Sequence, residues 1–165
     1  MGKVELKKGI YWVGAIDWNI RIFHGYDTPE GTTYNAYLIV DEKIALIDTV
    51  KAPFFEEMVQ RIEEIIPLDK IDYLISNHVE KDHSGSLART KELAKNATII
   101  STERGKKGLT RYYKKDWPFQ TVKTGDTLDL GTRQVTFVEV PMVHWPDSMV
   151  TYSPSDKILF SNDAF

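Results

Sequence analysis

The feature that most constrains the fold of this chain is the polar stretch SNHVEKDHSGSL at residues 76–87, which lies between two regular patterns. The run before it, DYLISN at 72–77, is typical of a buried β-strand, and SLARTKELAKN at 86–96 has helical spacing. The loop between them holds more imidazole and carboxylate groups than hydrogen bonding ordinarily requires. These groups belong to His78, Glu80, Asp82 and His83.

We interpret this concentration of polar groups as a metal-binding site. Alternation along the end of a strand places His78 and Glu80 on the same side, and a tight turn would bring Asp82 and His83 to the same point. Imidazole and carboxylate ligands suit zinc, iron or manganese. The sequence has no cysteine, which excludes thiolate zinc sites, iron–sulfur clusters and cysteine catalysis. The alternative is a solvated loop in which Asp82 and Ser84 cap the next helix, but capping explains neither histidine.

Further candidate ligands lie at the ends of predicted strands downstream. His144 lies in PMVHWPDSM, and Asp163 follows the apolar run of ILFSNDAF. Taken alone, each is more often a packed residue or a turn residue, but their common placement at strand ends favours a shared site with residues 76–87. Asp48, in ALIDT, is a third acid at a strand end, placed to orient a metal ligand without binding the metal itself.

The order of strand and helix patterns predicts an α/β fold. Strands at both sides of amphipathic helices favour a layered sandwich over a helical bundle. A chain of 165 residues suits one hydrophobic core, so residues 1–165 are expected to form a single unit. The predicted strands are 9–16, 33–40, 43–49, 72–77 and 97–102, the predicted helices are 52–66, 86–96 and 103–115, and short strands follow from Phe119.

Charge and hydropathy exclude several classes of function. The net charge of −3 gives no electrostatic reason to expect nucleic acid as a partner. The basic stretch RGKKGLTRYYKK at 104–115 could suggest one, but a solvated helix face that buries Leu109 and Tyr112 is the simpler interpretation. No apolar run resembles a signal peptide or is long enough to span a bilayer, so a cytoplasmic location without membrane contact is expected.

The pattern H-x-E-x-D-H at 78–83, followed by His144 and Asp163, resembles the metallo-β-lactamase-fold domain of flavodiiron proteins. These A-type flavoproteins are oxygen and nitric oxide reductases. The resemblance covers essentially the whole chain, including DWNIRIFHGYDTPEGTTYNAYLI and LFSNDAF. It implies an α/β (α+β) fold, the αββα sandwich. Hydrolases of the same fold use histidine where Glu80 stands, and a carboxylate there favours a pair of iron ions over zinc.

The resemblance also implies a role for each candidate residue. His78, Glu80 and His144 would bind one iron, and Asp163 would bridge both ions. Asp82 and His83 would belong to the second iron, with His83 the more variable ligand in the family. His24, in RIFHGYD, matches a histidine that lines the pocket, which gives it a catalytic rather than a ligand role.

Family members continue past the point that corresponds to Phe165. They supply a further histidine ligand and a flavodoxin-like domain that carries FMN. Residues 1–165 are therefore expected to be the N-terminal portion of the diiron domain, incomplete at its C-terminus. The resemblance implies that the missing part, or a second chain, supplies FMN in a head-to-tail homodimer or higher oligomer. A rubredoxin-like protein is the expected electron donor, and the basic residues 104–115 could help to dock it.

Three hypotheses of function follow. The first is a diiron oxidoreductase domain that reduces dioxygen to water, nitric oxide to nitrous oxide, or both, with electrons delivered through FMN. The second is a zinc-dependent hydrolase of the same fold, against which Glu80 argues. The third is a non-catalytic, metal-binding fragment that a second chain completes.

Overall fold

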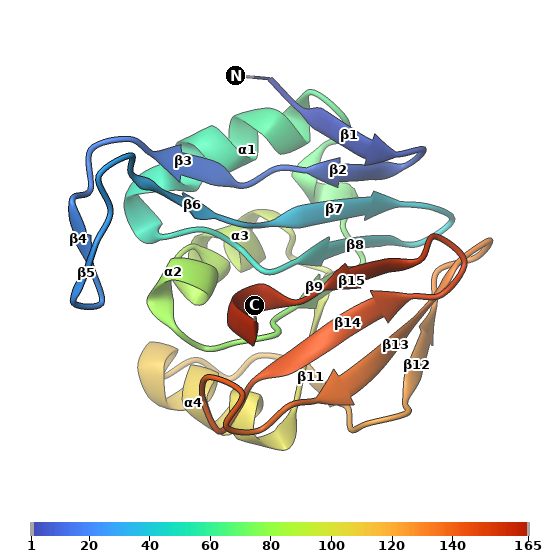
Figure 1. The fold of residues 1–165 in the computed structure, drawn as a ribbon. Coiled ribbons are helices and arrows are strands. Elements are labelled where there is room, and N and C mark those ends of the chain that lie inside the picture. The colour runs from blue at the N-terminus through green and yellow to red at the C-terminus, as the bar shows by residue number, and fades with distance from the viewer. Residues whose placement is uncertain (1, 165) are drawn as a thin grey trace.

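The computed structural model describes residues 2–164 and shows two β-sheets packed face to face, with helices against the outer face of the larger sheet (Figure 1). Within these residues, the larger sheet has seven strands in the order β1-β2-β7-β8-β9-β10-β11. Its strands are β1 (Val4–Lys7), β2 (Ile10–Trp12), β7 (Tyr37–Val40), β8 (Ile44–Ile47), β9 (Tyr73–Ile75), β10 (Thr98–Ser101) and β11 (Phe119–Thr121).

The second sheet and two short hairpin-like pairs complete the strands of residues 2–164. The second sheet consists of β12 (Thr127–Asp129), β13 (Gln134–Glu139), β14 (Met149–Ser153) and β15 (Ile158–Phe160). The two pairs are β3 (Ala15–Asp17) with β6 (Thr32–Tyr34), and β4 (Ile22–Phe23) with β5 (Tyr26–Asp27).

Helices connect the parallel strands of the larger sheet. The α-helices are α1 (Phe55–Glu63), α2 (Lys81–Ser84), α3 (Leu87–Leu93) and α4 (Glu103–Tyr113), and the 3₁₀ helices are η1 (Ala52–Phe54), η2 (Leu68–Lys70) and η3 (Asn162–Ala164). Within residues 2–164, no helix combines the length and the apolar character needed to cross a bilayer.

Alternation along the central strands separates the two layers of the core. Leu38 and Leu46 belong to the cluster that packs against α1 and α3, whereas Ile39 and Ile47 belong to the cluster shared with the second sheet. Because neighbouring side chains of a strand point to opposite faces, the nearly continuous apolar runs of β7 and β8 supply both clusters. The α/β sandwich predicted from the sequence is confirmed.

The direction of the strands places the chain segments that matter for function. Strands β8, β9, β10 and β11 are mutually parallel, so their carboxyl ends lie at one edge of the sheet. Polar loops follow β8 and β9 at that edge, beginning with Asp48 and Ser76. In α/β sheets this edge is where ligands bind.

Several predicted boundaries differ from those observed. The strand predicted at 9–16 is divided into β2 and β3, and neither β1 nor the β4–β5 pair was predicted. The α4 helix forms despite two glycines. A Cβ atom at Gly105 would lie 2.1 Å from Ser101 Oγ and one at Gly108 would lie 3.0 Å from Val79 Cγ1, so larger residues would be crowded at both positions. Both glycines therefore allow close packing rather than breaking the helix. Leu109 is buried as predicted, but Tyr112 is 44% exposed, so its predicted burial is wrong.

An ion-pair cluster centred on Arg133 joins the two sheets. Arg133 Nε donates to Asp156 Oδ2 at 3.0 Å, Arg133 Nη1 lies 3.5 Å from Asp41 Oδ2, and Arg133 Nη2 donates to the carbonyl of Lys8. Burial would raise the pKa of Asp156, but the Ser153 hydroxyl and the Arg133 charge outweigh it and lower that pKa below 3.8. The cluster therefore stabilises the fold while its carboxyl groups are ionised.

Replacing Arg133 should destabilise the fold in a pH-dependent way. We expect Arg133→Met to lower the free energy of unfolding by about 1–3 kcal/mol at pH 7, because it leaves two partly buried carboxylates, those of Asp41 and Asp156, without their cation. Because the pKa values of Asp41 and Asp156 are lowered in the folded protein, the stability that the cluster contributes is present above about pH 4 and is lost at lower pH. The variant should therefore lose less stability on acidification than the original protein. Urea unfolding at several pH values measures both effects. Lys43→Met, at an exposed pair with Asp72, is the control, and an equal loss there would contradict the proposed role of burial.

Candidate metal centre

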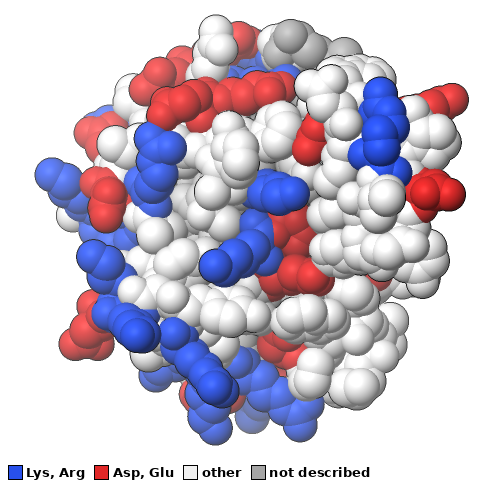
Figure 2. Space-filling model, turned by 90° about the vertical axis from the view of Figure 1, so that its left-hand side faces the viewer, with Lys and Arg blue, Asp and Glu red and all other residues white. Residues whose placement is uncertain are grey.

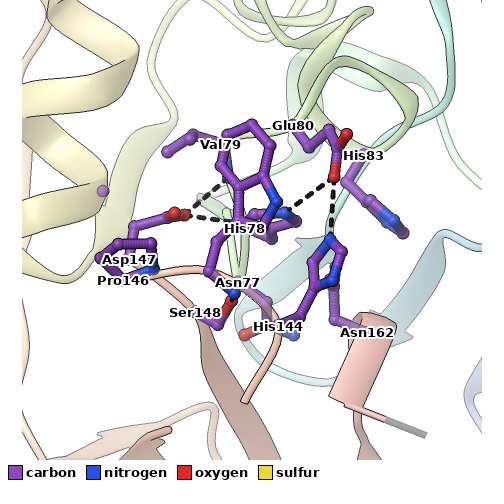
Figure 3. A network of polar contacts seen from close by, with 12 residues as sticks. Asn77, His78, Val79, Glu80, His83, His144, Pro146, Asp147, Ser148 and Asn162 are labelled. Atoms are coloured by element: carbon purple, nitrogen blue, oxygen red, sulfur yellow. Dashed lines mark hydrogen bonds and ion pairs between the residues drawn. The ribbon is translucent and has the colours of Figure 1, made fainter. Parts of the chain in front are cut away.

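Three segments far apart in the sequence bring imidazole and carboxylate groups together at the carboxyl edge of the larger sheet (Figure 3). The first runs from the end of β9 through α2, the second is the loop before β14, and the third is η3 after β15. The ligand atoms form two groups, within each of which all atoms lie within 4.8 Å of one another. One group is His78, Glu80, His144 and Asp163, and the other is Asp82, His83 and Asp163.

Glu80 lies at the centre of the first group. Its Oε2 atom is 3.2 Å from His78 Nε2 and 3.0 Å from His144 Nε2. His144 Nε2 also lies 3.6 Å from Asp163 Oδ2, which connects this group to the second. Four nitrogen and oxygen donors thus lie close together, supplied by two loops and a 3₁₀ helix.

His83 lies at the centre of the second group. Its Nε2 atom is 2.9 Å from Asp163 Oδ1 and 3.2 Å from Asp82 Oδ2, yet it makes no hydrogen bond of acceptable direction to any group in residues 2–164. Asp82 Oδ1 is also buried without a hydrogen-bond partner among the described residues. Buried polar atoms are normally satisfied, so orphaned imidazole and carboxylate atoms facing one another fit the ligand positions of a metal ion.

The electrostatics of the second group favour a bound cation. Burial would lower the pKa of His83, but the carboxylates of Asp163, Asp82 and Asp48 outweigh it and raise that pKa to about 10. In turn, the charge of His83 outweighs burial and lowers the pKa of Asp163. Without a metal, a proton on His83 therefore neutralises part of the carboxylate charge.

Metal binding should release that proton. An imidazole must be neutral to bind a metal ion, so at pH 7 we expect the second group to lose a proton from His83 as it binds, and its apparent affinity to rise about tenfold for each pH unit toward pH 10. Calorimetric titration of the metal-free protein in two buffers that differ in ionisation enthalpy measures the number of protons released. His83→Asn should abolish this release; an unchanged number of protons would show that another group carries them.

One buried residue, Asn77, connects the segments that carry the candidate ligands through its backbone and its side chain. Its backbone N–H donates to Asp48 Oδ1 at 2.8 Å, and its carbonyl accepts from Met149 N at 2.9 Å. Its amide nitrogen donates to the carbonyl of Phe160 at 3.3 Å, and its amide oxygen accepts from Thr151 Oγ1 at 2.7 Å. The end of β9 is thereby fixed to β8, β14 and β15 at once.

The Asp48 carboxylate supports the site by hydrogen bonding to residues that neighbour the candidate ligands. Its Oδ2 atom accepts a hydrogen bond from Asn162 Nδ2 at 3.0 Å, next to Asp163. The adjacent Thr49 donates from its N–H and its hydroxyl to the carbonyl of His83, at 2.8 and 2.7 Å. Asp48 therefore holds the chain on both sides of the second group, beside Asn77 and Asn162.

Several residues with strained backbone conformations lie around this site. Four non-glycine residues near it have φ values in the left-handed region, which side chains with a Cβ atom adopt only at a cost. They are His24 (50°), Asp48 (56°), Asn162 (53°) and His144 (89°). Such strain persists where surrounding contacts over-determine the conformation, and here those contacts hold polar groups together.

The structure also settles the local geometry that the sequence left open. Asp82 and His83 lie on the short helix α2 rather than after a tight turn, and no side chain caps that helix. Ser84 Oγ donates instead to the carbonyl of Val79 at 2.6 Å, and Ser86 makes no capping hydrogen bond to α3. The capping alternative is therefore wrong for this loop.

His24 and Asp147 also reach the candidate site. His24, in the turn between β4 and β5, has its Nε2 atom 3.3 Å from Glu80 Oε1, and its imidazole is 40% exposed. Asp147, which sequence reasoning missed, has its Oδ2 atom 2.9 Å from His78 Nδ1. The signal was an acid three residues after His144, but its partner lies 69 residues away in the sequence.

Comparisons with known proteins show the family to which this chain is similar. A model described as "ODP family beta lactamase" matches residues 32–165. The nitric oxide reductase of Moorella thermoacetica is 50% identical over 165 residues, which cover 98% of this chain and 41% of the relative. The rubredoxin-oxygen oxidoreductase of Megalodesulfovibrio gigas is 48% identical over an alignment that covers 100% of this chain and 42% of the relative. The crystal structure of the flavodiiron protein from Giardia intestinalis superposes with a TM-score of 0.93 at 46% identity, over 98% of this chain and 40% of that one.

Fold and donor set together define a metallo-β-lactamase-like domain. The chain belongs to the ODP beta-lactamase family, as found in flavodiiron proteins, and the resemblance stated from the sequence is confirmed. It spans about two fifths of the length of the curated relatives described above.

Proposed function

We propose that this chain forms the diiron-binding domain of an enzyme that reduces dioxygen to water, nitric oxide to nitrous oxide, or both. The observation that carries the proposal is Glu80, a carboxylate in contact with His78 and His144 where hydrolases of this fold have histidine. Relatives named for nitric oxide reduction, rubredoxin-dependent oxygen reduction and coenzyme F420H₂ oxidation support it, the last being 49% identical and from Methanothermobacter marburgensis.

The residues present fit two iron ions. His78, Glu80 and His144 would hold one ion, Asp82 and His83 the other, and Asp163 would bridge them, because its two oxygens face different groups. A mixed imidazole and carboxylate set without thiolate suits iron. Bound there, iron supplies the redox chemistry that protein side chains lack.

His24 would act on protons rather than on the metal. Both proposed reductions consume one proton for each electron, so the site needs a path from solvent. The His24 imidazole is partly exposed, and its Nε2 atom lies against Glu80 Oε1. We assign it the role of carrying a proton between solvent and the pocket, with the β4–β5 pair fixing its position.

Electrons would come from FMN carried by a part of the protein outside these residues. Exposed apolar side chains on the segments that carry His24 and His144 give a surface on which a flavin-bearing domain of a second subunit could pack head to tail. They are Trp18, Ile22, Tyr26, Met142 and Val143. The outer face of the second sheet, where Leu159 is 45% exposed, would be covered by the continuing chain.

A rubredoxin-like electron donor would be attracted by charge. Figure 2 shows a band of Lys and Arg side chains along the lower edge of the face that carries α4, next to acidic groups at its centre. The exposed basic residues of this region include Arg104, Lys107, Arg111, Lys114 and Lys115, and none forms an ion pair within residues 2–164. An unneutralised basic surface speeds association with an acidic protein.

Metal content tests the proposal directly. In full-length protein purified without oxygen, we expect about two irons for each chain and reduction of dioxygen or nitric oxide. Glu80→His should shift the binding preference toward zinc and lower reductase activity at least about 100-fold, because it removes a charge from the first group. Mass-spectrometric metal analysis and gas consumption measure these effects, with Glu63→His on α1 as the control. Zinc alone in the unmodified protein, with ester or thioester hydrolysis, would overturn the proposal.

Loss of the proposed bridge should affect both ions. We expect Asp163→Ala to lower affinity for both metals, because its oxygens contact His83 and His144, whereas Asp82→Ala should weaken one ion only. Metal stoichiometry together with electron paramagnetic resonance of the coupled pair distinguishes the two variants. A magnetically coupled pair retained in Asp163→Ala would show that Asp163 is a turn residue and not a bridge.

A further inference from the structure

We propose that Asp147 is a positioning residue that holds His78 in the tautomer and orientation that metal binding requires. The inference rests on the proposed metal centre and adds a residue that does not itself touch the metal. Asp147 Oδ2 lies 2.9 Å from His78 Nδ1 and accepts a second hydrogen bond from Val79 N at 2.9 Å. Figure 3 shows Asp147 and Glu80 on opposite sides of the His78 ring.

The hydrogen bond determines which ring nitrogen is free. An ionised carboxylate only accepts hydrogen bonds, so the shared hydrogen must belong to His78 Nδ1. The lone pair of a neutral imidazole then lies on Nε2, the atom that faces Glu80 at 3.2 Å. Asp147 thereby presents a metal-binding nitrogen to the first group.

Burial makes this contact effective. His78 has no solvent-exposed surface and Asp147 is only 7% exposed, so water competes little for either group. The ring of His78 is also packed edge-on against Trp145, with ring centres 5.1 Å apart. In contrast, His83 Nδ1 has no hydrogen-bond partner among residues 2–164, so no equivalent hydrogen bond orients the His83 ring.

The loop that carries both His144 and Asp147 is held in place by residues at the start of α4. Thr102 Oγ1 donates to the carbonyl of Asp147 at 3.3 Å, and Arg104 Nη1 donates to the carbonyl of Pro146 at 3.1 Å. The loop before β14 therefore contributes one candidate ligand directly and orients another through Asp147. A ligand oriented in this way typically binds metal about 10–100 times more tightly than one whose partner is removed.

The test compares metal affinity with the stability of the metal-free protein. Full-length metal-free protein is titrated with Co²⁺, whose absorption reports its coordination, in competition with a chelator, and its melting temperature is measured separately. Asp147→Ala should weaken binding of the ion held by the first group about 10–100-fold and alter the Co²⁺ spectrum. Asp147→Asn, which keeps an acceptor oxygen, should retain the fold and show a smaller loss.

Asp156→Asn is the matched control, because Asp156 is a largely buried aspartate that pairs with Arg133 away from the candidate ligands. It should lower the melting temperature without changing Co²⁺ affinity or spectrum. If both Asp147 variants lower only the melting temperature, Asp147 is structural and the inference is overturned. If the unmodified protein binds no metal, the proposed metal centre itself fails, which is a different result from loss of affinity in the variants alone.

Discussion

The candidate site depends on the hydrogen bonds of one buried residue, Asn77. Through its backbone and its amide it joins Asp48 at the end of β8, Met149 and Thr151 of β14, and Phe160 of β15. Each of the three segments that bear candidate ligands is thus located relative to the same side chain. Because Asn77 is 1% exposed, any displaced segment would leave buried polar groups unsatisfied, which is costly. The hydrogen bonds of this one residue therefore fix the two sheets and the three loops relative to one another.

Holding carboxylates this close works against the stability of the metal-free fold. Glu80, Asp82 and Asp163 would repel one another without intervening positive charge, and the raised pKa of His83 shows how strongly they draw a proton. The strained backbone at His144 adds to the cost. A bound cation relieves the repulsion, so metal binding and folding should support each other. The packed sheets and the Arg133 cluster supply stability from elsewhere in the molecule.

The periodicity of apolar residues in the sequence predicted local elements but few of the contacts between distant segments. The apolar runs of β8 and β9 were found because their neighbours pack on both faces, and the polar loop at 76–87 stood out against them. The β4–β5 pair gave no such signal, since Ile22 and Tyr26 are largely exposed and its position depends on contacts with distant residues. Asp147 was missed because its partner, His78, lies 69 residues away in the sequence. In α4, the predicted burial of Tyr112 was wrong by one position, because the helix turns Tyr113 inward toward Ser84.

Glu80 contacts three histidines of the candidate site at once. A carboxylate has two oxygens with several lone pairs, so Oε2 can face His78 and His144 while Oε1 faces His24. A neutral histidine at this position would offer a single acceptor nitrogen and could not contact all three imidazoles in this way. The residue that makes the site more anionic therefore also gives the β4–β5 turn a partner within it. Glu80 therefore brings His24 beside the candidate ligands and also supplies the carboxylate on which the proposed preference for iron rests.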